Sequence, residues 1–275
     1  MKDVIHYHRV PDTSDLILSE GFYSEFEFKP HYHLDYHIGL VVDGIQHQRF
    51  QGQSVLLGPG RISVMPPGEI HDGSGYEHGE YCMRTFRIAP ALLSEYFAEF
   101  AGKEDDAFFA GAMVENPEIA ANLVRLYDGM QSYDGIKNTV GLTALPIEET
   151  WIKLFEPLFT ELKVVIPEAI SGGLSLQQLH RVQDYCYENL ANKISLEQLA
   201  ALCDLSRYQF LRRFERSMGL TPHNWLTQLR LERACLLLRQ PNQNLAQIAV
   251  DVGFYDQSHF VRAFRKWYGI APSQY

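Results

Sequence analysis

A short motif occurs twice in the last seventy residues of this 275-residue chain, at an offset of fifty residues. Residues 206–214 (SRYQFLRRF) align with residues 256–264 (DQSHFVRAF). The alignment continues without a gap to Gly219, which falls on Gly269, and a pair of prolines follows three residues later. Two copies are too few for a solenoid, so the pattern indicates a small duplicated unit.

Each copy has the pattern of two short helices joined by a tight turn. Asp204 occupies the turn position in the first copy and Gly253 in the second. Glycine adopts the left-handed backbone conformation freely, and aspartate tolerates it better than most residues. A capping residue, Ser206 or Asp256, then begins the second helix, which in the second copy is expected over 257–268. Capping boxes support the helix starts of the first copy: Ser195 with Gln198, and Ser206 with Gln209. The sequence therefore predicts two helix-turn-helix units.

The second helix of each copy is expected to bury its phenylalanines and to expose a basic face. Early positions on such a helix reach base edges in the major groove, and later or flanking cations contact phosphates. Two matching basic faces favour DNA binding over a merely solvated surface. The residues that we expect to contact DNA are Arg207, Tyr208, Gln209, Arg212 and Arg213 in the first copy, and Gln257, Ser258, His259, Arg262, Arg265 and Lys266 in the second.

The net charge of the whole chain is −10, which by itself argues against nucleic-acid binding. The charges are, however, distributed unevenly between the two parts of the chain. Residues 1–171 hold 12 Lys and Arg against 26 Asp and Glu, whereas residues 172–275 hold 12 against 8. Such asymmetry is typical of an acidic domain joined to a nucleic-acid-binding one. Phosphate contacts need cations, and the C-terminal part supplies them.

The C-terminal part resembles the DNA-binding domain of the AraC/XylS family of bacterial transcription regulators. The residues that carry the resemblance span roughly 175–275 and include Leu199-Ala200, Phe210, Arg212, Phe214, Gly219, Pro222, Ile248-Ala249, Gly253-Phe254, Ser258, Phe260, Arg262, Phe264, Gly269 and Pro272. The resemblance implies two recognition helices on one face of DNA, joined by a long helix over 222–238. It also implies that Tyr208, Arg212, Gln257, Ser258 and Arg262 contact bases. Leu211 departs from the pattern, because a polar residue is frequent at that position.

Residues 1–90 alternate short apolar runs with turn signals, as an all-β unit does. Within them, His31-x-His33-x3-His37-x6-Gly44 is followed by Gly60-x5-Pro66-x-Gly68-x2-His71. This spacing resembles the two motifs of cupin barrels, with His37 where a glutamate usually stands and Gly75 where an asparagine is usual. Cupin-like barrels are also the usual effector-binding domains of the AraC/XylS family, so the two resemblances agree.

The histidines leave two interpretations open. His31, His33, His37 and His71 occupy the positions of cupin metal ligands, and neutral imidazoles suit a divalent transition metal. The alternative, which we favour, is a metal-free pocket in which no cofactor is required and the same four histidines, with Tyr36 and Arg84, bind a small polar effector. Arg87 is a further candidate for that role.

Residues 91–170 are expected to be mostly helical, with one helix from Pro117 to about Met130 and another from Pro146 to Leu162. Such helices would cover the barrel, and the family resemblance adds a homodimer contact through one of them. Residues 171–175, within the longer stretch PEAISGGLS, predict a short linker.

Together these features predict an α+β multidomain protein. The expected parts are a cupin-like β-barrel with accessory helices (1–90 and 91–170), a linker (171–175) and an all-α domain with two helix-turn-helix motifs (176–275). We expect a transcription regulator that binds double-stranded promoter DNA as a homodimer, answers to an effector, and contacts RNA polymerase if it is an activator. The alternative is a metal-dependent cupin enzyme with an appended DNA-binding domain. The N-terminal sequence lacks the apolar core of a signal peptide, and no window approaches a membrane span, so we expect a cytoplasmic protein rather than a membrane protein.

Overall fold

The computed structural model describes residues 3–10, 15–50, 52–93, 108–131, 155–162, 164–165, 170–240 and 244–275. The chain divides into two compact units, Met1–Ile166 and Pro167–Tyr275. None of the helices in the described part of the chain has the length and apolar character that a membrane crossing requires.

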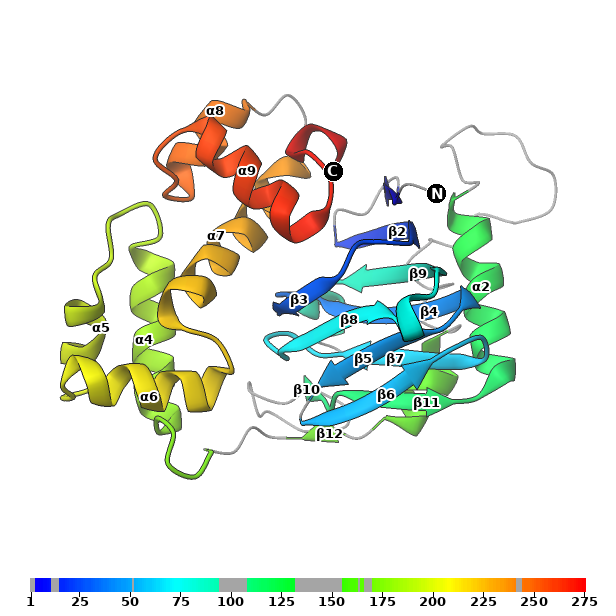
Figure 1. The fold of residues 1–275 in the computed structure, drawn as a ribbon, viewed down its shortest axis with the longest axis horizontal. Helices are drawn as coiled ribbons and strands as arrows, with labels where there is room; N and C mark the ends of the chain where they lie inside the picture. The colour runs from blue at the N-terminus through cyan, green and yellow to red at the C-terminus, as the bar shows by residue number, and fades with distance from the viewer. Residues whose placement is uncertain are drawn as a thin grey trace. The chain divides into compact units, whose positions relative to one another are not determined.

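The N-terminal unit is built on two antiparallel sheets that pack face to face (Figure 1). The six-stranded sheet has the order β1-β2-β9-β4-β7-β11, and the four-stranded sheet has the order β3-β8-β5-β6. A double-sheet arrangement of this kind is the architecture of cupins, so the predicted cupin-like barrel is confirmed. The strands are β1 (Val4–Arg9), β2 (Leu16–Tyr23), β3 (Phe28–His31), β4 (Tyr36–Gly44), β5 (Gln46–Phe50), β6 (Gln53–Leu57), β7 (Arg61–Met65), β8 (His71–Gly75), β9 (Tyr81–Ile88) and β11 (Ala112–Glu115).

Side-chain alternation along the strands builds two separate cores. In β4, Tyr36 and Ile38 belong to the larger core on the outer face of the six-stranded sheet, whereas Val41 packs between the two sheets. The inter-sheet core takes Leu57 from the four-stranded sheet as well. Since successive residues of a strand point to opposite faces, neighbours in sequence serve different cores.

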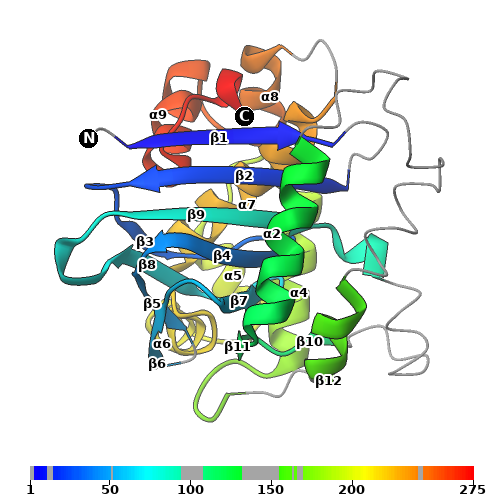
Figure 2. The same ribbon diagram turned by 90° about the vertical axis from the view of Figure 1, so that its right-hand side faces the viewer.

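Helix α2 (Pro117–Gln131) lies across the outer face of the six-stranded sheet, as Figure 2 shows. Asn116 accepts a hydrogen bond from the amide of Ile119 and so caps the helix start that the sequence predicts. The buried face of α2 includes Leu123 and Tyr127, both fully buried. The accessory helix therefore covers the sheet as expected.

The expectation that residues 91–170 are mostly helical is wrong at three places. Ala112–Glu115 forms β11, which pairs with β7 and extends the six-stranded sheet. Phe108–Phe109 (β10) and Val164–Val165 (β12) pair with each other. Such short strands are stabilised by partners distant in sequence, which local periodicity does not reveal. Residues 155–161 are helical, whereas the expected helix start at Pro146 lies outside the described residues.

The C-terminal unit consists of helices on either side of a long central helix, α7 (Figure 1). The capping boxes at Ser195 and Ser206 are confirmed, and Asp256 caps α9 by accepting a hydrogen bond from the amide of His259. The predicted linker packs against this unit, because Leu174 is buried and its amide donates to Ser217 Oγ. The helices are α4 (Leu176–Glu188), α5 (Leu196–Leu202), α6 (Arg207–Met218), α7 (Pro222–Leu238), α8 (Leu245–Asp251) and α9 (Gln257–Tyr268).

Candidate functional site

The two recognition helices, α6 and α9, present matching faces. Phe210 and Phe214 are buried on α6, and Phe260 and Phe264 are buried at the corresponding positions of α9. With 3.6 residues per turn, positions two residues away from a buried phenylalanine lie on the opposite side of the helix. All the residues predicted to contact DNA are exposed, namely Arg207, Tyr208, Gln209, Arg212, Arg213, Gln257, Ser258, His259, Arg262, Arg265 and Lys266.

Three of these exposed residues also make contacts inside the unit. The Gln209 side chain accepts a hydrogen bond from the amide of Ser206 at 3.1 Å and closes the capping box. Arg207 forms an ion pair with Glu197 of α5 at 2.6 Å. The ring of His259 packs edge-on against Phe254 at 5.1 Å. These three side chains are therefore partly engaged in contacts within the C-terminal domain.

Arg230 on α7 connects the two helix-turn-helix units, a role that the sequence did not indicate. Its Nη2 donates to the carbonyl oxygen of Asn192 at 2.8 Å, and its Nε donates to that of Leu190 at 3.2 Å. Both carbonyls lie between α4 and α5 of the first unit. The turn of the second unit packs on the same point, because a Cβ at Gly253 would lie 2.3 Å from the Leu190 oxygen. Arg230 thus lies where the two helix-turn-helix units meet.

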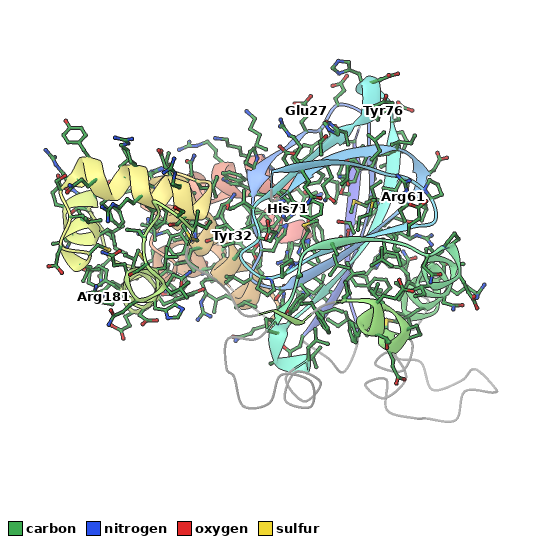
Figure 3. All side chains as sticks on the ribbon, turned by 90° about the horizontal axis from the view of Figure 1, so that it is seen from below. Glu27, Tyr32, Arg61, His71, Tyr76 and Arg181 are labelled. Atoms are coloured by element: carbon green, nitrogen blue, oxygen red, sulfur yellow. The ribbon has the colours of Figure 1, made fainter. Side chains whose placement is uncertain are left out.

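In the N-terminal unit, four histidines from both sheets meet. His31 on β3 and His71 on β8 are paired across their strands, with ring centroids 4.3 Å apart. His33 lies 5.3 Å from His71 and stacks on His37 of β4 at 3.5 Å. This histidine cluster (His71 is labelled in Figure 3) agrees with the convergence that the cupin resemblance implies.

The donor set of the histidine cluster fits a metal ion at three of the four histidines. One nitrogen from each of His31, His33 and His71 lies within 4.8 Å of the others, and His37 is not in that group. Nδ1 of His31 and Nδ1 of His71 contact the carbonyl oxygens of Lys29 and Glu69. A carbonyl only accepts, so these Nδ1 atoms carry the proton, and Nε2 is the ring nitrogen with a lone pair.

His37 has a different environment. Burial, together with the neighbouring His33, Arg87, His71 and His31, holds the pKa of His37 well below its ordinary value and keeps the ring neutral. Its Nε2 is buried and has no hydrogen-bond partner among the described residues, and the same is true of Oε1 of Gln46 on β5. Nε2 of His37 therefore remains able to bind a polar group beside the other histidines, whereas the Gln46 side chain donates to the hydroxyl of Tyr81 at 3.1 Å.

The two candidate arginines of β9 lie on opposite faces of the strand. Arg87 is buried and forms an ion pair with buried Asp35 at 3.1 Å. Its charge acts on His37, so it belongs with the histidine cluster. Arg84 points to the other face, where it pairs with Glu20 at 2.8 Å and with Asp128 of α2 at 2.9 Å. The structure does not bring Arg84 to the histidines.

Tyr36 also lies away from the histidine cluster. It is one residue before His37 on β4, so its ring enters the core beneath α2 and packs against Phe109. Its hydroxyl accepts a hydrogen bond from the amide of Phe109 at 3.2 Å. Of the six residues expected in the effector pocket, the four histidines come together, whereas Tyr36 and Arg84 face the outer core. Arg87 joins the histidines instead.

A double-sheet ligand-binding fold followed by two helix-turn-helix units defines a class of protein, the ligand-responsive transcriptional regulators. Comparison with known families agrees. Residues 14–155 match the AraC-like ligand binding domain, and residues 199–275 match a helix-turn-helix domain. The chain belongs to the AraC family of transcriptional regulators, and it combines the ligand-binding and DNA-binding domains of that family.

Individual relatives match this chain over all or part of their length. The probable transcriptional regulator LumQ of Photobacterium leiognathi is 36% identical over 90% of this chain and 92% of its own length. An HTH-type transcriptional regulator of Haemophilus influenzae is 40% identical over 40% of this chain, a match that spans 37% of that protein. The crystal structure of ToxT from Vibrio cholerae O395 has the same fold, with a TM-score of 0.62, 14% identity and coverage of 96% of this chain and 97% of that one.

Proposed function

We propose that this regulator binds a specific promoter sequence through α6 and α9, and that a small polar effector bound at the histidine cluster changes its occupancy of that promoter. The observation that carries the proposal is the pair of matching basic faces on the two recognition helices. The effector would act through a difference in affinity for two states of the protein. We propose that the chain works by binding and not by catalysis.

Arg212 and Arg262 are the proposed principal base readers, because they lie at equivalent exposed positions and arginine suits the O6 and N7 atoms of guanine. Replacing either by alanine is expected to cost about 1–3 kcal/mol of binding and to relax base preference at one position of the site. The measurement is affinity for every single-base variant of a duplex that the wild-type protein enriches from a random pool.

Two other variants separate base reading from charge. Lys266→Ala should weaken binding to all sequences alike and reduce the salt slope by about one, as expected for a phosphate contact. Arg181→Ala removes a cation from α4, outside both recognition helices (Arg181 is labelled in Figure 3). Arg212 and Arg262 would not be base readers if their variants behaved like Arg181→Ala.

The effector site is proposed between the two sheets, at the four histidines and Arg87. The unpartnered His37 Nε2 favours an effector that carries a group able to form a hydrogen bond with it. A thermal-shift screen of the full-length protein against small polar metabolites tests this, because a ligand of the native state raises the melting temperature. His37→Phe should abolish the shift that an active compound produces.

We propose that effector binding requires no metal, although His31, His33 and His71 would hold a divalent transition ion. Such an ion would supply a Lewis-acidic position for a ligand atom. The part of the cluster that converges provides three imidazoles and no carboxylate, and His37 is stacked on His33 instead of joining the other three. Elemental analysis of protein purified without chelator should find less than one equivalent of metal. A full equivalent that is lost in His71→Ala would overturn this proposal.

The remaining partners are proposals of the same kind. We propose that the protein acts in the cytoplasm, where promoter DNA is found, and that it binds as a homodimer through an accessory helix. At promoters that it activates, it would contact RNA polymerase. Analytical ultracentrifugation with and without operator DNA tests the dimer, since a monomer in both conditions would exclude it.

A further inference from the structure

The turn of the second helix-turn-helix unit is one residue longer than the turn of the first. The amide of Leu205 donates to the carbonyl of Ala200 at 3.1 Å, and in the second unit Phe254 donates to Ala249 at 2.8 Å. These equivalent bonds are offset by 49 residues, and so are the two left-handed turn positions, Asp204 and Gly253.

At the N-caps of the two recognition helices, the offset between the units is fifty residues. Ser206 and Asp256 are the N-caps of the two recognition helices, and each accepts a hydrogen bond from the amide three residues later. Between Leu205 and Ser206 the first unit has no residue, whereas between Phe254 and Asp256 the second unit has Tyr255. Tyr255 is therefore an insertion without a counterpart in the first unit.

The inserted side chain points into solvent. Tyr255 is 90% exposed, while Phe254 beside it is buried. A single exposed aromatic residue is not unusual in itself. Its position is informative, because it directly precedes the helix cap Asp256 and the proposed base-reading residues Gln257 and Ser258. The nearest carboxylate in sequence, that of Asp256, is engaged with the amide of His259 at 2.7 Å.

We propose that Tyr255 contacts the DNA backbone and anchors the second recognition helix in a way that the first lacks. In helix-turn-helix proteins the start of the recognition helix enters the major groove, so the turn before it lies beside a phosphate strand. Tyrosine hydroxyls donate hydrogen bonds to phosphate oxygens, and such contacts set the register without reading sequence. The phenol O–H binds a phosphate oxygen, and the ring covers the adjacent sugar.

This inference rests on the DNA binding proposed above, and affinity measurements on the full-length protein test it. Two probes are used: a duplex enriched by the wild-type protein from a random pool, and a random-sequence duplex. Tyr255→Phe removes only the hydroxyl, and it should weaken binding to both duplexes by roughly three- to tenfold. Tyr255→Ala should weaken both further. The salt slope should not change, since no charge is removed.

The control is Tyr187→Phe, which removes a hydroxyl from an exposed tyrosine of α4, outside the recognition helices. It should leave both affinities unchanged, and melting temperatures should confirm that every variant is folded. Equal affinity of Tyr255→Phe, Tyr255→Ala and wild type would overturn the proposal. So would a change in base preference, or a loss of transcription at unchanged DNA affinity, which would indicate a protein partner. Failure of the wild-type protein to bind either duplex would instead contradict the proposed function itself.

Discussion

Asp35→Asn is expected to destabilise the N-terminal unit by about 3–5 kcal/mol, the usual cost of removing one partner of a buried ion pair. The Arg87 side chain is 1% exposed and that of Asp35 is 4% exposed, so water cannot replace the lost carboxylate. The guanidinium would remain charged, because its pKa is too high for deprotonation. Urea denaturation of the full-length protein, followed by a signal from the N-terminal unit, measures the change.

The matched control is an ion pair at the surface. Arg49 and Asp72 also join neighbouring strands, at 2.6 Å, but the Arg49 side chain is 63% exposed. Asp72→Asn should therefore cost at most about 1 kcal/mol, as exposed pairs do. Adding Arg87→Met to Asp35→Asn should recover much of the stability, because it removes the buried charge. Equal losses for Asp35→Asn and Asp72→Asn would show that burial of the Asp35–Arg87 pair has no energetic consequence.

Gly253→Ala is expected to destabilise the C-terminal unit by about 2–4 kcal/mol and to abolish specific DNA binding. Gly253 has a φ of +87°, which costs a residue with a side chain about 1–2 kcal/mol. In addition, the new methyl group would lie 2.3 Å from the carbonyl oxygen of Leu190 and 2.9 Å from the guanidinium of Arg230. That collision would displace the contact that joins the two helix-turn-helix units. Thermal denaturation and operator affinity are the measurements.

Two substitutions isolate the collision from the backbone strain. Gly68 has a φ of +81°, and a Cβ there meets no atom within 4 Å, so Gly68→Ala should cost only the strain, about 1–2 kcal/mol. Asp204 has a φ of +55° at the equivalent turn of the first unit. Asp204→Gly should leave DNA binding intact. If Gly253→Ala and Gly68→Ala had the same cost, the close approach at Leu190 would not matter.

The predictions that the structure confirmed concern local interactions. Ser206 and Asp256 cap their helices because a short polar side chain reaches an amide three residues later. The left-handed turn at Asp204 depends on that residue and its immediate neighbours, so the local sequence was sufficient to locate it. The cupin-like spacing of the two histidine motifs also correctly predicted that the four histidines lie together.

The predictions that failed depended on which face of a strand a residue occupies. Arg84 and Arg87 are three residues apart on β9 and therefore lie on opposite faces, but the inward face was not evident from the sequence. The same holds for Tyr36 beside His37. The strand at Ala112–Glu115 was missed because its partner, β7, is about fifty residues earlier in the chain.

The sequence by itself determined the family, the two helix-turn-helix units and the exposed residues of their recognition helices, because these follow from patterns within a few helical turns. Only the tertiary structure decided which of Tyr36, Arg84 and Arg87 faces the histidines, the buried Asp35–Arg87 pair, the contact of Arg230 and the insertion of Tyr255. Each of these depends on hydrogen bonds or packing between segments that are distant in sequence or equivalent only in space. Side-chain periodicity carries no information about such contacts until the strands and helices are placed.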